Sequence, residues 1–253
     1  MASVFDAVAR EVAEISTAAR NLRRERIFFT GMAVAMTLVC IAGFAPSYYL
    51  KAHFRPAPLS ALVHVHGAVF TSWMLLLVAQ TSLIARGRAH LHRRLGIAGG
   101  ILAIFMVATG AAVVWVRGTT PTPAMPHDFM LRMLALSVVA LIAFTTLAGL
   151  AIWFRHQAAV HKRLIILATI VVIGAAVHRL LIWLISPTVG PLMFFGFTDL
   201  FVVALGGYDF ISRGRLHPAT IWGGTAVVAS QATALMLAGS GSWLAFARWA
   251  TGT

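Results

Sequence analysis

Two histidines stand at matching positions of a repeated sequence pattern. Residues 86–95 read Arg-Gly-Arg-Ala-His-Leu-His-Arg-Arg-Leu, and residues 155–164 read Arg-His-Gln-Ala-Ala-Val-His-Lys-Arg-Leu. The alignment pairs His92 with His161, and a fainter third copy, Leu216-His217-Pro218, adds His217. Repeated helices bring equivalent positions together around a pseudo-symmetry axis, so these imidazoles are candidate metal ligands or axial ligands of a haem. Taken singly, each histidine is also explained as an interfacial cation that hydrogen-bonds to lipid headgroups.

The charge around His92 and His161 favours a haem over a bare divalent metal ion. A dication is repelled by the cations that crowd the same loops, whereas haem propionates would pair with them. We therefore expect haem b at this inner centre, with zinc or iron as the alternative. The cations are Arg86, Arg88, Arg93, Arg94, Arg155, Lys162 and Arg163.

A second set of histidines lies toward the opposite ends of the apolar segments. His64 and His66 open one segment, and residues two apart on a helix do not share a face. The sequence leaves open which of the two points inward, because two faces compete: His66, Trp73 and Gln80, or His64, Thr71 and Ser82.

His178, Arg179 and Asp199 are ionisable residues inside otherwise apolar segments. Such residues usually face the interior of a bundle, where they are paired or functional. Arg179 is the natural ion-pair partner of Asp199. We expect an outer centre ligated by His66 (or His64) and His178.

Arg132 adds a cation near this outer centre. Together with Arg179, it would hold propionates or an anionic substrate, although Asp128 precedes Arg132 at the i, i+4 spacing of a simple helix pair. Two alternatives remain for the outer cluster. One is a polar network that only fixes helix register; the other is a Zn²⁺ site that activates water for lipid hydrolysis, with the ligands His66, His178 and Asp199.

The elements that must position these residues are transmembrane helices. The 253 residues are 60% hydrophobic and 11% charged, less than half the charge of a typical soluble domain. A bilayer core requires runs of about 20 apolar residues. Seven such runs predict an all-α, polytopic membrane protein with seven spans, or six if the glycine-interrupted sixth run is too short. The runs are approximately 27–50, 60–85, 95–116, 129–153, 163–186, 191–211 and 219–247, the last long enough to break at Gly239-Ser240-Gly241.

The formal charge of +13 is a topology signal and not a nucleic-acid signal, because the basic residues concentrate in the N-terminal segment and in alternate loops. The positive-inside bias then predicts a multi-pass membrane protein with a cytoplasmic N-terminus and an outside C-terminus. The bilayer and its anionic headgroups are the expected partners.

The chain divides into an N-terminal segment, 1–26, and a single bundle, 27–253. Val4, Val8, Val12, Ile15, Ala19 and Leu22 recur at spacings of three and four, which predicts an amphipathic helix lying on the inner membrane surface. Within the bundle we expect parallel hairpin repeats, approximately 60–116 and 129–186, with 191–247 as a fainter copy.

The motifs His66-Gly67, Leu91-His92-Arg93-Arg94-Leu95-Gly96 and His161-Lys162-Arg163-Leu164 resemble a bacterial family of multi-span membrane proteins classed as a domain of unknown function. More distantly, they are similar to proteins associated with terminal oxidase assembly. This resemblance covers the second to fifth spans and implies an inner-membrane location.

A looser resemblance is to diheme cytochrome b and ferric-reductase-like proteins, in which four helices supply one bis-histidine haem site near each membrane face. It implies that His92 and His161 form the inner pair. The outer pair departs from that pattern, because the fourth span offers only His127 and His178 lies on the fifth.

The sequence therefore predicts an inner-membrane, histidine-ligated haem or metal protein that acts in membrane electron transfer. The two alternatives are the metal-dependent membrane hydrolase and a non-catalytic subunit or assembly factor that works beside other membrane protein subunits.

Overall fold

The structure, a computed structural model, describes residues 2–54, 58–121 and 125–253, and these residues form helices without a strand. Pro46 lies in a π-helical turn that ends the first long helix. The elements are α1 (Ala2–Phe44), the π-helical turn η1 (Ala45–Tyr49), α2 (Lys51–Phe54), α3 (Ala61–Ala85), α4 (Ala89–Thr119), α5 (His127–Trp153), α6 (Ala158–Leu184), α7 (Pro191–Arg213), α8 (Pro218–Gly239) and α9 (Gly241–Thr251).

Among the residues that the structure describes, seven helices are long and apolar enough to cross a membrane, which confirms the all-α polytopic fold and the count of seven over six. The sixth span, α7, keeps its full length despite its glycines. Large apolar side chains such as Ile97, Ile104, Ile211 and Trp222 are exposed on the outside of the bundle. In a membrane protein these side chains contact the lipid chains.

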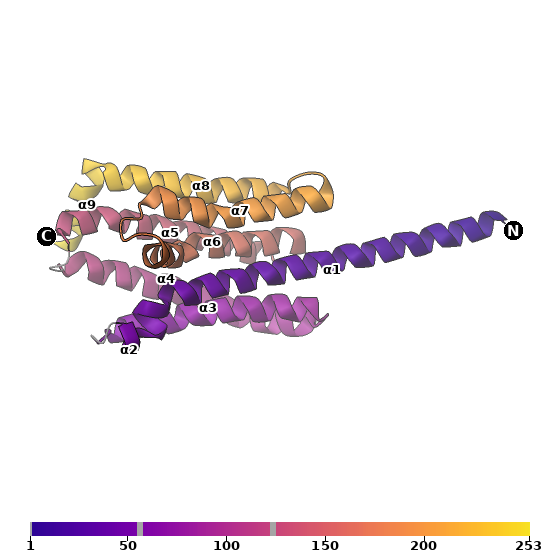
Figure 1. Cartoon of the computed structure of the whole chain (residues 1–253), viewed down its shortest axis with the longest axis horizontal. Coiled ribbons are helices and arrows are strands. Elements are labelled where there is room, and N and C mark those ends of the chain that lie inside the picture. The colour runs from indigo at the N-terminus through magenta and orange to yellow at the C-terminus, as the bar shows by residue number, and fades with distance from the viewer. Residues whose placement is uncertain (1, 55–57, 122–124) are drawn as a thin grey trace.

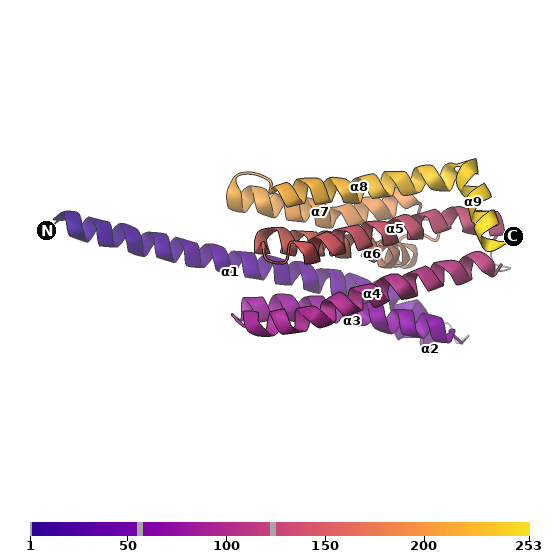
Figure 2. The same ribbon diagram turned by 180° about the vertical axis from the view of Figure 1, so that it is seen from behind.

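The spans after α1 form three consecutive hairpins, α3–α4, α5–α6 and α7–α8, which run in the same direction (Figures 1 and 2). The α5–α6 hairpin lies in the middle, with α1 and α3–α4 on one side and α7–α8 on the other. The loops within the three hairpins lie at the end of the bundle from which α1 projects. The C-terminus lies at the opposite end.

The helix α6 is the most enclosed span, because α1, α5, α7 and α8 all pack on it. It approaches α1 closely at Gly43, where a Cβ atom would overlap the backbone oxygen of Ala176. Small residues permit such close helix crossings in membranes. The core on this side of α6 includes Met36, Met74 and Phe144, all fully buried.

The N-terminal segment is helical, as predicted, but it is not a separate interfacial helix. It continues into the first span as the single helix α1, whose first half projects beyond the bundle along the same direction (Figure 1). Ile15 and Leu22 are exposed on it. The side chains of Val4, Val8 and Val12 lie outside what the structure describes.

The last apolar run breaks at the predicted place. α8 ends at Gly239 and α9 begins at Gly241, with the Ser240 hydroxyl accepting from the Trp243 amide at 3.1 Å. The predicted Asp128–Arg132 pair is not formed. Arg132 donates to the carbonyl oxygens of Ala238 (3.1 Å) and Ser240 (3.2 Å) at the end of α8, and Asp128 pairs instead with Arg248 of α9 at 2.5 Å.

Candidate functional site

His92 and His161 lie next to each other at the end of the bundle that carries the hairpin loops. Their ring centroids are 6.3 Å apart, and the ring planes are nearly perpendicular, at 80°. His92 lies in the first turn of α4 and His161 in the first turn of α6. Both rings are partly exposed. The repeat therefore brings these two predicted site residues together.

The imidazole of His161 is held in one tautomer. Its Nδ1 lies 2.8 Å from the carbonyl oxygen of Ala151 in the last turn of α5. A carbonyl only accepts, so Nδ1 carries the proton and Nε2 keeps its lone pair. This backbone contact to the second nitrogen is what orients histidine ligands in metal sites.

His92 is oriented by Gln80 of α3. With the side-chain amide turned to satisfy its neighbours, its nitrogen donates to Nδ1 of His92 at 2.7 Å and its oxygen accepts from the Gly96 amide at 3.0 Å. In the opposite orientation of the same amide, the oxygen faces Nδ1 and would accept a hydrogen bond from a protonated Nδ1. The tautomer of His92 is thus coupled to the orientation of Gln80.

The structure shows which of the two candidate faces of α3 points into the bundle. His66, Trp73 and Gln80 all point into the bundle, and His64 is exposed. The indole of Trp73 donates to the hydroxyl of Thr169 on α6 at 3.2 Å. The seven-residue spacing therefore marks the inward face of this helix.

The outer histidines do not form a pair. Nδ1 of His66 lies 3.2 Å from the Thr109 hydroxyl on α4, whereas the His178 ring packs on Phe194 of α7 with centroids 5.0 Å apart. The reason is helix phase. His178 follows Thr169, which faces α3, by nine residues, which is about two and a half turns, so His178 points away from α3. The expected outer centre of His66 and His178 is not assembled.

Arg179 and Asp199 also find different partners from those expected. The guanidinium of Arg179 lies over the Phe44 ring of α1, 4.7 Å from its centroid, and acts electrostatically on His66. Asp199 instead accepts from the Gln231 side chain of α8 at 2.7 Å. The predicted ion pair between Arg179 and Asp199 is therefore wrong.

The expected zinc ligands do not converge. Asp199 is held by Gln231 and His178 by Phe194. Across the described ranges no three His, Cys, Asp or Glu side chains are grouped as a metal site would need. Arg132, expected to hold propionates or substrate, instead donates hydrogen bonds to carbonyl oxygens at the end of α8.

His217 serves as a helix cap and does not join His92 and His161. Its Nδ1 accepts from the Ala219 amide at 3.0 Å, and its ring is buried. Burial, followed by the charges of Arg163 and Arg213, lowers the pKa of His217 below its ordinary value. The third copy of the repeat thus keeps the histidine but uses it to begin α8.

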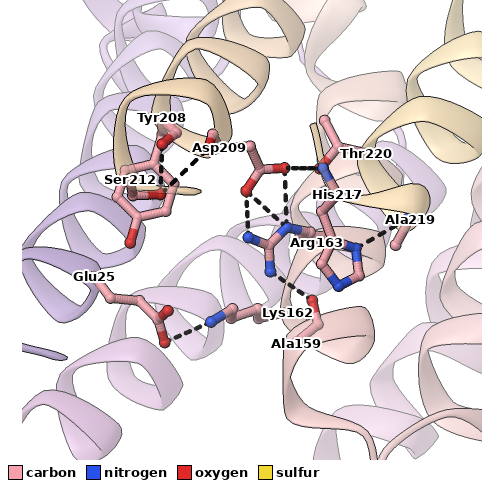
Figure 3. Close-up of polar contacts among 10 residues, drawn as sticks. All are labelled: Glu25, Ala159, Lys162, Arg163, Tyr208, Asp209, Ser212, His217, Ala219 and Thr220. Atoms are coloured by element: carbon pink, nitrogen blue, oxygen red, sulfur yellow. Dashed lines mark hydrogen bonds and ion pairs between the residues drawn. The ribbon is translucent and has the colours of Figure 1, made fainter. Parts of the chain in front are cut away.

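A buried ion pair beside His217 was not predicted from the sequence. Arg163 of α6 and Asp209 of α7 are paired with both side chains buried (Figure 3). Asp209 also accepts from the Thr220 hydroxyl at 2.5 Å and from the His217 amide at 3.2 Å. This cluster joins the central hairpin to α7 and α8. The only sequence signal for it was Asp209 itself, an acid near the end of an apolar run.

Lys162, the neighbour of Arg163, pairs with a different helix. Its ammonium group pairs with Glu25 of α1 at 2.5 Å and lies 4.9 Å from the centroid of the Phe29 ring, over which the Arg163 guanidinium also lies, at 5.8 Å. Figure 3 shows the two ion pairs as neighbours. The Leu-His-Arg-Arg-Leu-like motif on α6 thus contributes one candidate ligand and two links to neighbouring helices.

Comparisons with protein-family models, with curated proteins and with solved structures find no match to this chain.

Proposed function

We propose that the chain binds haem through His92 and His161 near one membrane face and acts in membrane redox chemistry. The observation that carries this proposal is that the two imidazoles lie next to each other, 6.3 Å between ring centroids. Two axial nitrogens, each about 2 Å from a metal centre, require histidine rings at about this separation. A bis-histidine haem is one electron carrier of this kind.

The residues around the pair bear on ligation in two ways. The Ala151 carbonyl accepts from Nδ1 of His161, so in the neutral ring Nε2 carries the lone pair that a ligand needs. In the orientation that satisfies its neighbours, the Gln80 nitrogen donates to Nδ1 of His92, so ligation through Nε2 of His92 would require this amide to turn over and accept from Nδ1. His161 is thus supported through the nitrogen that a ligand leaves free, and His92 would be supported in the same way only after this turn of Gln80.

Exposed arginines surround this end of the bundle and would pair with the carboxylates of a bound haem. Arg86, Arg88 and Arg93 lie on the α3–α4 side, and Arg155 lies in the α5–α6 loop. A haem held here would exchange single electrons with a carrier at the membrane surface.

The same basic end is proposed to face the cytoplasm of a bacterial cell. The projecting half of α1 and the three hairpin loops lie together at this end and carry most of the Lys and Arg residues. The positive-inside bias places such an end in the cytoplasm, beside anionic headgroups. The C-terminus would then lie outside.

The test is an absorption spectrum of the purified protein before and after dithionite reduction, with haem and metal measured on the same sample. The wild-type protein is expected to show a Soret band that sharpens and an α-band that appears on reduction. His92→Ala and His161→Ala should each lose these bands. His90→Ala and His156→Ala are matched controls, because both histidines are exposed on the same two segments, and both should keep the bands.

A colourless wild-type protein expressed with sufficient haem would reject the haem proposal. Bands that persist in both His92→Ala and His161→Ala would reject these residues as ligands. A chain with neither haem nor metal would favour the role of a subunit or assembly factor. The feature that fits that role is the exposed first half of α1, which projects from the bundle.

A further inference from the structure

A groove runs along one side of α1 where this helix leaves the bundle beside the end of α3. Ala85, at the last turn of α3, closes one side of it. Figures 1 and 2 show α1 passing the end of α3 at this point. The other lining residues lie on one face of α1: Ala19, Leu22, Arg23, Arg26, Ile27, Thr30, Gly31 and Val34.

The groove is divided into a cationic end and an apolar end. Arg23 and Arg26 are exposed at the end nearer the N-terminus. Ile27 and Val34 are exposed further along, within the membrane-spanning part of α1. Cations at the membrane surface followed by apolar side chains toward the bilayer centre match the charge distribution of a phospholipid with an anionic headgroup.

The two arginines are not neutralised by the protein. Glu25, the one acid on this part of α1, is turned away and paired with Lys162 of α6. Among the described residues, neither Arg23 nor Arg26 takes part in a salt bridge. Arg26 donates to the carbonyl oxygen of Ala85 at 3.4 Å, which places its guanidinium at the rim.

From these observations we infer that the groove of α1 and α3 is a binding site for one anionic phospholipid, with its phosphate on Arg23 and Arg26. The site does not depend on whether His92 and His161 hold a haem. Basic loops attract anionic membranes in general. This site differs, because two cations and an apolar groove lie next to each other and together match a single phospholipid.

Native mass spectrometry of the full chain tests the site, with phosphatidylglycerol or phosphatidylcholine added to the detergent solution. The wild-type protein is expected to retain one phosphatidylglycerol in preference to phosphatidylcholine. Each arginine at an anionic surface contributes roughly a factor of five in affinity, so Arg23→Gln with Arg26→Gln should weaken binding roughly 30-fold. Arg213→Gln with Arg215→Gln removes the same charge from exposed residues of the α7–α8 loop and should leave binding unchanged.

A second variant blocks the groove without changing charge. A Cβ atom at Gly31 meets nothing within 4 Å, so Gly31→Leu should fold normally, fill the groove and expel the lipid. Gly196→Leu, at an equally open glycine of α7, is its control. The inference fails if the Arg23/Arg26 variant and Gly31→Leu bind phosphatidylglycerol as the wild type does, or if both arginine double variants lose it equally. It also fails if the wild type is a dimer that Gly31→Leu separates, since a second copy would then occupy the groove.

Discussion

Arg163 of α6 is buried against Asp209, whereas Arg94, which occupies the matching position of the repeat on α4, is exposed. The difference follows from what each hairpin packs against. α7 and α8 cover the Arg163 face of α6, but the corresponding face of α4 carries Ile97 and Ile104, which are both exposed. The same position of the repeat therefore holds an exposed cation on α4 and, on α6, a buried cation that links α6 to α7.

Removing one member of this pair is expected to be strongly destabilising. Arg163→Met leaves the Asp209 carboxylate buried without its cation, which typically costs about 3–5 kcal/mol. Adding Asp209→Asn should restore part of that loss, because the amide oxygen still accepts from Thr220. Thermal unfolding followed by tryptophan fluorescence measures both effects. Glu25→Gln, which breaks the more exposed pair with Lys162, should cost at most about 1 kcal/mol; an equal loss from Glu25→Gln and Arg163→Met would contradict this account.

Gly43 is expected to tolerate no side chain. In Gly43→Ala the new methyl group would overlap the backbone oxygen of Ala176, and neither helix can yield without moving, so a loss of about 1–3 kcal/mol is expected. Gly31→Ala on the same helix meets nothing and should be neutral or up to about 1 kcal/mol more stable. The unfolding temperatures of the two variants in one detergent compare them directly. A Gly43→Ala protein as stable as Gly31→Ala would show that α1 and α6 are not in close contact.

Gln80 should influence haem binding through its hydrogen bond with Nδ1 of His92. Gln80→Leu removes this hydrogen bond, and loss of such a supporting contact typically costs about 10–100-fold in affinity. Haem titration into the apoprotein would measure this. Gln231→Leu, which changes a glutamine bound to Asp199 instead, is the matched control. Equal haem affinity in the wild type and Gln80→Leu would remove Gln80 from the site.

Acid should weaken the fold through His217. Because its pKa is lowered in the folded chain, the unfolded chain binds more protons as the pH falls through the ordinary histidine value, about 6.5. Stability is therefore complete above that pH and declines below it until the folded pKa is reached. His217→Asn keeps an oxygen that can cap α8 but does not titrate. Its unfolding temperature should fall less than that of the wild type between pH 7.5 and roughly 5.5; parallel curves would exclude His217 as the cause.

The proposed orientation of the chain in the membrane can be determined by cysteine labelling. Cys40, the only cysteine of the chain, is 1% exposed, so it should not react in the folded protein. Gln157 and Thr120 are exposed at opposite ends of the bundle. In intact cells a membrane-impermeant maleimide should label Thr120→Cys and should reach Gln157→Cys only after lysis. The reverse pattern would invert the topology.

The seven spans were predictable because hydrophobic length is a local property, although helices such as α1 and α4 begin several residues before their apolar runs. The break at Ser240 also follows from local sequence. The spacing of His66, Trp73 and Gln80 marked one of two candidate inward faces of α3, and the folded bundle shows which of the two points inward. The pairing of His92 with His161 was predictable because the sequence repeats.

Contacts between helices that no repeat relates were not predictable. Arg179 and Asp199 have suitable charges, but the direction of each side chain depends on the rotation of α6 and α7, which the sequence does not give. Arg163 was counted as a loop cation because a sequence window does not show which loop residue lies beneath another helix.

The contact of Gly43 with Ala176 also bears on the order in which the protein is made. α1 precedes the other described spans in the chain, and its Gly43 face packs on α6, which is synthesised after three further spans. Until α6 is made, this face of α1 lacks its native partner. The final seating of α1 against α6 is therefore a late event in biogenesis, and a chain arrested after α5 would hold α1 in the bilayer beside α3 but without α6.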